Sequence, residues 1–174
     1  MKRIIFFFTV ILLLFPMFSE PLTGFSGISF GTDRRTVKTE LEKQGWWSFY
    51  SDSEDKDSYV GLSSKDLNLE GYAIAKMETS FDYNDIFFDV RFYLDSSLSE
   101  ADFEQLLIKL DNKYGMDYLN NIDGGLYYET DNGNIIMVTL GTQRSLITNA
   151  TERIFVIEMF DRKLQRNNYN YNHR

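Results

Sequence analysis

Two adjacent segments alternate apolar and polar side chains with a period of two, and this pattern constrains the fold more than any other feature of the sequence. The clearer segment is 86–94, where alternate positions are all apolar: Ile86, Phe88, Val90, Phe92 and Leu94. Residues 71–81 repeat the pattern less strictly, and the polar residues 82–85 separate the two segments. Such alternation is the signature of antiparallel strands with one buried face. The sequence therefore predicts a β-hairpin over 71–94.

Two other segments place apolar residues at helical spacing. Residues 33–44 carry a thin apolar stripe, Val37 and Leu41, and Gly45 follows as a stop signal. The stronger helix begins near Ser99 and ends at Gly115, and its apolar positions are Phe103, Leu106, Leu107, Leu110 and Tyr114. Because only one face of this helix is apolar, we expect it to lie on a sheet.

The remaining pattern predicts an α+β protein. Shorter strands are expected at 25–30, 46–50, 59–62, 126–129, 134–140 and 153–160. Asn132-Gly133 indicates a hairpin turn in which both residues take positive φ. We therefore predict an antiparallel sheet of about six or seven strands with two helices packed on one face. The layout is compatible with two α-β-β-β units in tandem, and coincidence is the alternative explanation.

The first residues read as a targeting segment. An uncharged apolar run, 4–18, follows Lys2 and Arg3, which is typical of a secretory signal peptide. The run falls short of the roughly 20 apolar residues that span a membrane. We expect a signal peptide over 1–19, cleaved within 19–26, and an uncleaved membrane anchor is the alternative. A single α+β domain over 25–163 and a disordered Asn-rich tail over 164–174 would follow.

Composition excludes several kinds of chemistry. The chain has no cysteine, which excludes disulfides, thiolate metal sites and a lipid attached to a signal-peptide cysteine. Its single histidine, His173, lies in the tail, so neither a Ser-His-Asp triad nor a histidine-rich metal centre is expected. The net charge of −8 argues against a nucleic-acid partner. No cofactor is expected, and the location should be periplasmic or extracellular.

One short stretch carries a resemblance. The sequence Gly27-Ile28-Ser29-Phe30-Gly31, followed by Val37, Leu41 and Gly45, resembles the opening of small exported bacterial domains of the BamE/SmpA and β-lactamase-inhibitor-protein type. The resemblance implies helices on an antiparallel sheet and a protein-binding module, not an enzyme. This chain lacks the anchor cysteine of the lipoprotein members, and it has one helix before each strand run where they have two.

Aromatic side chains supply the candidate binding surface. Its members are four residues opposite the predicted core face and an adjacent tryptophan pair: Tyr72, Ile74, Phe87, Tyr93, Trp46 and Trp47. A strand would point adjacent tryptophans to opposite faces and expose one of them. Exposed aromatic clusters mark binding surfaces. The competing interpretation is that a second layer, a loop or the tail covers this face.

The preferred function is therefore an exported, non-catalytic binding or interaction module whose partner is another protein. One alternative is a carboxylate-based hydrolase of an envelope polymer, with Glu78, Asp89 and Glu129 as candidate acids. The other is a small-molecule or lipid carrier with an enclosed apolar cavity. A weak calcium candidate also exists, although a solvated hairpin tip explains it better: Asp52, Glu54, Asp55 and Asp57.

Overall fold

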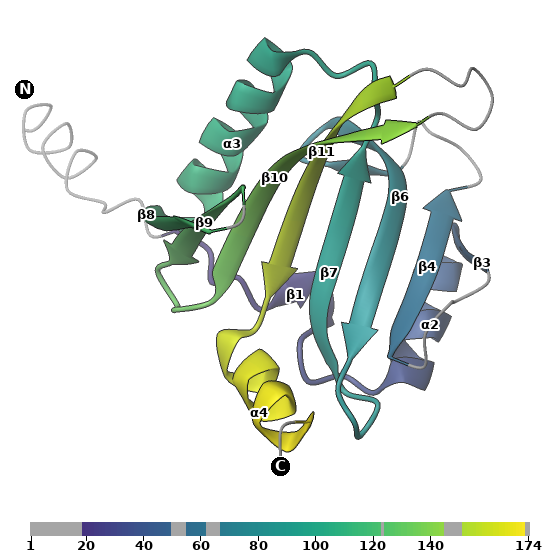
Figure 1. Cartoon of the computed structure of the whole chain (residues 1–174). Coiled ribbons are helices and arrows are strands. Elements are labelled where there is room, and N and C mark those ends of the chain that lie inside the picture. Colours follow the sequence, from purple (N-terminus) through teal and green to yellow (C-terminus); the bar gives the residue numbers. More distant parts are fainter. Residues whose placement is uncertain (1–18, 50–54, 62–66, 123, 145–150, 173–174) are drawn as a thin grey trace, which may run out of the picture.

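The computed structural model describes residues 19–49, 55–61, 67–122, 124–144 and 151–172, and in these ranges antiparallel β-sheet predominates (Figure 1). The described residues form three helices and eleven strands. Residues 1–18 of the expected signal peptide 1–19 lie outside them, as do Asp52 and Glu54 of the calcium candidate. No helix in the described ranges is long and apolar enough to cross a membrane.

One large antiparallel sheet organises the fold, in the order β3-β4-β6-β7-β11-β10-β9-β8 with β5 beside β6. The strands of its first half are β3 (Trp46–Phe49), β4 (Lys56–Gly61), β5 (Asn68–Leu69), β6 (Tyr72–Phe81) and β7 (Phe87–Leu94). Those of its second half are β8 (Met116–Ile122), β9 (Gly125–Thr130), β10 (Ile135–Arg144) and β11 (Thr151–Phe160). The halves join where β7 pairs with β11.

The α+β class with an antiparallel sheet is confirmed, but the predicted architecture is wrong. In the described residues the main sheet has nine strands, a second sheet has two, and three helices are present where two were expected. Five strands of the main sheet follow α2, β3 to β7, and four follow α3, β8 to β11, where three were expected after each helix. Periodicity missed β8 because this strand does not alternate: six of its seven residues are exposed.

The helices begin and end at the signals that the sequence contains. Asp33 caps α2 (Arg34–Lys43) by accepting a hydrogen bond of 3.0 Å from the backbone of Thr36. A capping box of Ser99 and Asp102 starts α3 (Glu100–Tyr114), as the sequence indicated. Gly115 ends α3 in the left-handed region, where a Cβ would also lie 2.5 Å from the carboxylate of Asp131. Both helices pack behind the sheet in the view of Figure 1.

The third helix, α4 (Arg162–Asn172), occupies most of the segment for which we predicted a disordered tail. Asp161 caps it, because its side chain accepts from the backbone of Leu164 at 2.9 Å. Tyr171 stacks on Tyr83 of the β6–β7 hairpin, with ring centroids 3.7 Å apart. A local cap and a contact distant in sequence thus order a segment whose composition alone suggested disorder.

The segment before α2 belongs to the folded domain. It contains the two-stranded hairpin β1 (Gly24–Phe25) and β2 (Ile28–Ser29). Leu22 is fully buried, and its carbonyl oxygen accepts from the side chains of Asn132 and Asn134. Phe25 packs edge-on against Phe92. Cleavage at the far end of the predicted range would remove Leu22 and Phe25 from the core.

Candidate functional site

Two irregularities in the β6–β7 register determine on which face of the sheet the predicted aromatic residues lie. The register shifts between Ile74 and Lys76, and again between Ser80 and Phe81. An extra residue at such a bulge turns the side chains beyond it to the other face of the sheet. Ile74 and Phe87 therefore lie in the main core, 4% and 2% exposed, and not on the open face that simple alternation predicted.

The other four candidate aromatics do not share one surface. Trp46 is buried in the core, whereas Trp47 is 59% exposed, so the tryptophan pair points to opposite faces as expected. Tyr72 packs against the core beneath the Lys109 ammonium, which lies 4.8 Å from the ring centroid. Tyr93 is half-buried and belongs to the polar network described next. The six residues consequently do not form a continuous aromatic patch.

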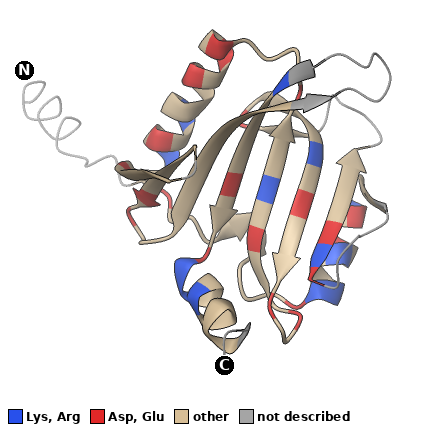
Figure 2. Cartoon of the chain, viewed as in Figure 1, with Lys and Arg blue, Asp and Glu red and all other residues tan. Residues whose placement is uncertain are grey.

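A row of charged residues crosses the middle of the sheet on β6, β7 and β11 (Figure 2). The residues next to them in each strand belong to the core that α2 and α3 cover, so the charged side chains lie on the opposite face. Glu78, Arg91 and Glu158 are direct neighbours on β6, β7 and β11. The Arg91 Nε donates to Glu158 at 2.7 Å. Glu78 accepts from the Lys76 ammonium at 2.5 Å and from the Tyr93 hydroxyl at 2.8 Å. Each charge of this row therefore has an opposite charge beside it.

Partial burial changes the proton affinities in this row. Burial, together with the Glu78 carboxylate, raises the pKa of Tyr93 to about 12. Burial also acts to raise the pKa of Glu78, but the hydrogen bonds from Lys76 and Tyr93 outweigh it and hold this pKa below its ordinary value. Glu78 thus stays ionised with both oxygens engaged, which suits a structural partner better than a general acid.

Asp89 lies next to this row and is the least ordinary carboxyl group of the described chain. It is 5% exposed, and its Oδ2 accepts from the Ser80 hydroxyl at 2.8 Å while Oδ1 has no hydrogen-bond partner. Burial, reinforced by the nearby charge of Glu158, raises the pKa of Asp89 to about 8. A group this enclosed is out of reach of a polymeric substrate. The third acid considered for hydrolysis, Glu129, pairs with Arg162 at 3.0 Å.

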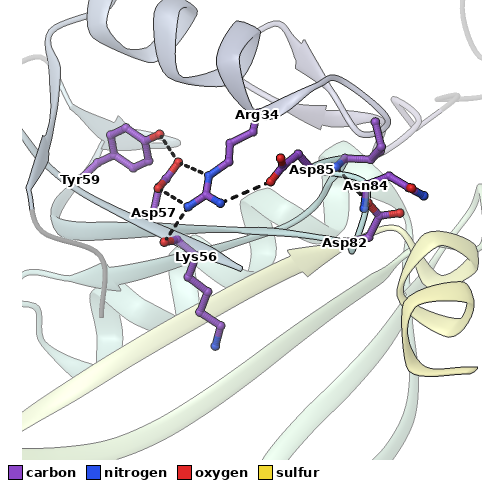
Figure 3. Close-up of polar contacts among 8 residues, drawn as sticks. Arg34, Lys56, Asp57, Tyr59, Asp82, Asn84 and Asp85 are labelled. Carbon is purple, nitrogen blue, oxygen red and sulfur yellow. Dashed lines mark hydrogen bonds and ion pairs between the residues drawn. The ribbon is translucent and has the colours of Figure 1, made fainter. Parts of the chain in front are cut away.

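A second polar cluster surrounds Arg34 at the start of α2 (Figure 3). Its Nε and Nη2 donate to the two oxygens of Asp57 at 3.1 and 2.8 Å, and its Nη1 lies 3.4 Å from the carboxylate of Asp85. The Tyr59 hydroxyl approaches the same Asp57 carboxylate at 3.4 Å. Because the residues come from α2, β4 and the β6–β7 hairpin, this cluster fastens three elements together.

The Arg34 cluster includes one residue of the calcium candidate. Of its two described members, Asp57 is engaged by Arg34, and Asp55 is exposed. Throughout the part of the chain that the structure describes, no group of three or more potential metal ligands comes together.

The exposed apolar residues gather instead at the outer edge of the second half of the sheet. The end strand β8 pairs with β9, and within the described ranges no further strand follows it in the sheet order. Three of its exposed side chains are large and apolar: Tyr118, Leu119 and Ile122 are 58%, 42% and 49% exposed. The strand contains no Pro or Lys, the residues that usually protect a sheet edge, and its single charge is Asp117. A bulge at Leu119 is the one protective irregularity in its pairing.

An apolar groove of about 390 Å³ lies between α3 and the strands beside this edge. Its walls include Phe103 and Phe155, whose rings stack with centroids 4.1 Å apart. Leu140 also lines the groove and is 53% exposed. The two charged residues of the lining, Glu100 and Glu104, are both acidic. The β8 edge and this groove together form the candidate functional site, and we call it the edge site.

Sequence reasoning misses the edge site because it predicts no strand at 116–122. The available signal was Tyr118, Leu119 and Ile122, three large apolar residues within a segment that has one charge. A loop seldom carries so many, whereas an interaction strand does. Comparisons with protein families, with curated proteins and with solved structures found no match to this chain.

Proposed function

We propose that this chain is an exported, non-catalytic module that binds an extended segment of another protein along the β8 edge. The observation that carries the proposal is the exposed, nearly uncharged end strand β8 with its three large apolar side chains. The outer side of an end strand presents unpaired backbone N–H and C=O groups, which an incoming strand can pair. Export rests on the basic start and the apolar run 4–18.

The surroundings of β8 define the chemistry of the partner segment. Its apolar side chains would contact the exposed β8 residues and enter the groove lined by Phe103, Phe155 and Leu140. Positive charge is favoured because Glu104 lines the groove and the chain as a whole carries a net charge of −8, whereas the other acid of the lining, Glu100, is paired with Arg153. The expected partner is thus an extended segment that alternates apolar residues with Lys or Arg.

The alternatives have less support from the geometry. A hydrolase needs two accessible carboxyl groups at a catalytic separation. Here Glu78 is held by Lys76, Asp89 is buried, and Glu129 pairs with Arg162. A carrier needs an enclosed apolar cavity, whereas the apolar groove of the edge site opens at the surface.

The test is a peptide selection. Random peptides of about ten residues, roughly two strand lengths, would be selected for binding to the purified protein. Their affinities would be compared for the wild type, the double variant Leu119→Lys with Ile122→Lys, and the control Trp47→Lys at the opposite edge. Trp47 is exposed on β3, so the control adds a positive charge to the other end strand of the same sheet.

We expect the selected peptides to alternate apolar and basic residues and to lose affinity by about tenfold or more in the double variant, since each lost apolar contact and each added like charge weakens binding. The Trp47→Lys control should bind like the wild type. Peptides that bind the double variant as tightly as the wild type would refute the proposal, provided that both variants give the wild-type circular dichroism spectrum.

A further inference from the structure

A second surface, at the opposite end of the molecule from the α3 start, concentrates positive charge in this acidic chain. Figure 2 shows basic residues at the beginning of α4. They line a pocket of about 700 Å³ formed by α4, the β9–β10 turn and the segment before α2. The basic residues of its lining are Arg162, Lys163 and Arg166, and the lining has one acid, Asp161. The volume is in the range of small-ligand sites.

Two of the three basic side chains of this pocket form no ion pair with another described residue. Arg162 pairs with Glu129 at 3.0 Å, and both side chains are partly exposed. Among the described side chains, Lys163 and Arg166 take part in no ion pair. The one acid, Asp161, caps α4 by accepting from the backbone of Leu164, so the lining holds three cations against one anion. Two cations thus remain available at the pocket.

Their position is unfavourable for the helix itself. Arg162 and Lys163 lie in the first turn of α4, which contains no acidic residue, and Arg166 follows one turn later. The N-terminal end of a helix carries partial positive charge, so cations there are repelled and an anion is attracted. Asp161 at the cap and Glu129 beside Arg162 offset part of this repulsion, whereas Lys163 and Arg166 have no ion-pair partner among the described side chains. A bound anion would offset the remaining repulsion.

The walls of the pocket are fixed before any ligand arrives. Asn132 and Asn134 hold the carbonyl of Leu22 at 3.0 and 2.8 Å, which joins the β9–β10 turn to the segment before β1. The backbone N–H of Arg162 donates to Asn134 at 3.3 Å, which joins the same turn to α4. Thr23 and Ser29 also line the pocket. This preorganisation lowers the cost of ordering the site when it binds.

From these observations we infer that the α4 pocket binds a phosphate-bearing ligand through Arg162, Lys163 and Arg166. Arginine presents paired donors that match the oxygens of a phosphate group, and lysine adds a point charge. The ligand is either a soluble phosphate ester or the headgroup of an anionic phospholipid. This site lies apart from the edge site, and its ligand is independent of the function proposed there.

The test uses inorganic phosphate as the probe and follows backbone amide resonances of the ¹⁵N-labelled protein by NMR. We expect saturable shifts at the start of α4 and in the 132–134 turn. The triple variant R162Q/K163Q/R166Q should raise the phosphate Kd by about tenfold or more, since charged hydrogen bonds are lost. The control R35Q/K38Q/K43Q removes the same charge from the exposed side of α2 and should leave the Kd unchanged.

Sedimentation with vesicles distinguishes the two sources of phosphate. Binding to phosphatidylglycerol vesicles but not to phosphatidylcholine vesicles, lost in the α4 variant, would assign the site to a lipid headgroup. Phosphate shifts without vesicle binding would assign it to a soluble ester. The inference is overturned if phosphate causes no saturable shift, or if both triple variants weaken binding equally. Should the α4 variant not fold, the single change Arg166→Gln provides the same comparison.

Discussion

Replacing Asp89 with Asn should remove a pH dependence of stability that is built into the sheet. The pKa of Asp89 is raised from 3.8 to about 8, mainly by burial. Between those two values the folded protein holds one proton that the unfolded chain releases. Stability should therefore fall by about 1.4 kcal/mol for each pH unit, or roughly 3 kcal/mol from pH 5 to pH 7. The loss is complete above the folded pKa.

The other carboxyl groups with shifted pKa values do not change the stability between pH 5 and pH 8. At Glu78 burial acts to raise the pKa, but the hydrogen bonds from Lys76 and Tyr93 outweigh it. Hydrogen bonds from Thr36 lower the pKa of Asp33, and those from Ser97 lower the pKa of Asp95. Stability contributed by a lowered pKa is lost only as the pH falls through that pKa. Between pH 5 and pH 8 the predicted slope therefore belongs to Asp89.

Urea unfolding, followed by the fluorescence of buried Trp46, would measure this slope at pH 5, 6, 7 and 8. We expect the free energy of unfolding of Asp89→Asn to be nearly flat, since its neutral amide can still accept from Ser80. The exposed Asp117, changed to Asn, is the matched control. Equal slopes in the wild type and in Asp89→Asn would refute the reasoning, and so would a wild type that gains stability as the pH rises.

Three further predictions concern the core and the polar clusters. Phe87→Ser should destabilise the protein by about 3–5 kcal/mol, whereas Trp47→Ser should cost under about 0.5 kcal/mol, because only Phe87 is buried; thermal denaturation of both variants checks this. Arg34→Met should cost about 1–3 kcal/mol in urea unfolding, since it leaves the partly buried Asp57 without its partner, and a loss below 0.5 kcal/mol would contradict the assigned role. Mass spectrometry of the exported protein should find Leu22 retained, because this residue is fully buried; a mature chain that starts after it would contradict the prediction.

The elements with strong local signals could be predicted from the sequence. The capping box at Ser99 and the stop at Gly115 define α3 in the structure as they do in the pattern. The hairpin at Asn132-Gly133 also forms, but only Gly133 takes positive φ, because the turn closes through Thr130 and Asn134. Local sequence signals thus predict that these elements form, but they predict the backbone angles of the turn less well.

The features that failed depend on contacts distant in sequence. Ile74 and Phe87 were assigned to the wrong face because strict alternation cannot show a bulge. The helix α4 combines a local cap at Asp161 with the stack of Tyr171 on Tyr83, and the stack cannot be predicted from a local pattern. The strand β8 is exposed on both faces and shows no periodicity at all. The exposed apolar side chains of β8 therefore lie at the edge of the sheet, and not on the sheet face where alternation predicts them.

Hydrogen–deuterium exchange with a selected peptide tests the edge site most directly. Backbone amides on the open side of β8 should exchange rapidly in the free protein and become protected when the peptide binds, because strand addition gives them hydrogen-bond partners. Amides of β3, the opposite end strand, should not change. Protection confined to β8 and the groove is the predicted result. Protection at β3, or peptide binding without any protection of β8, would contradict the account.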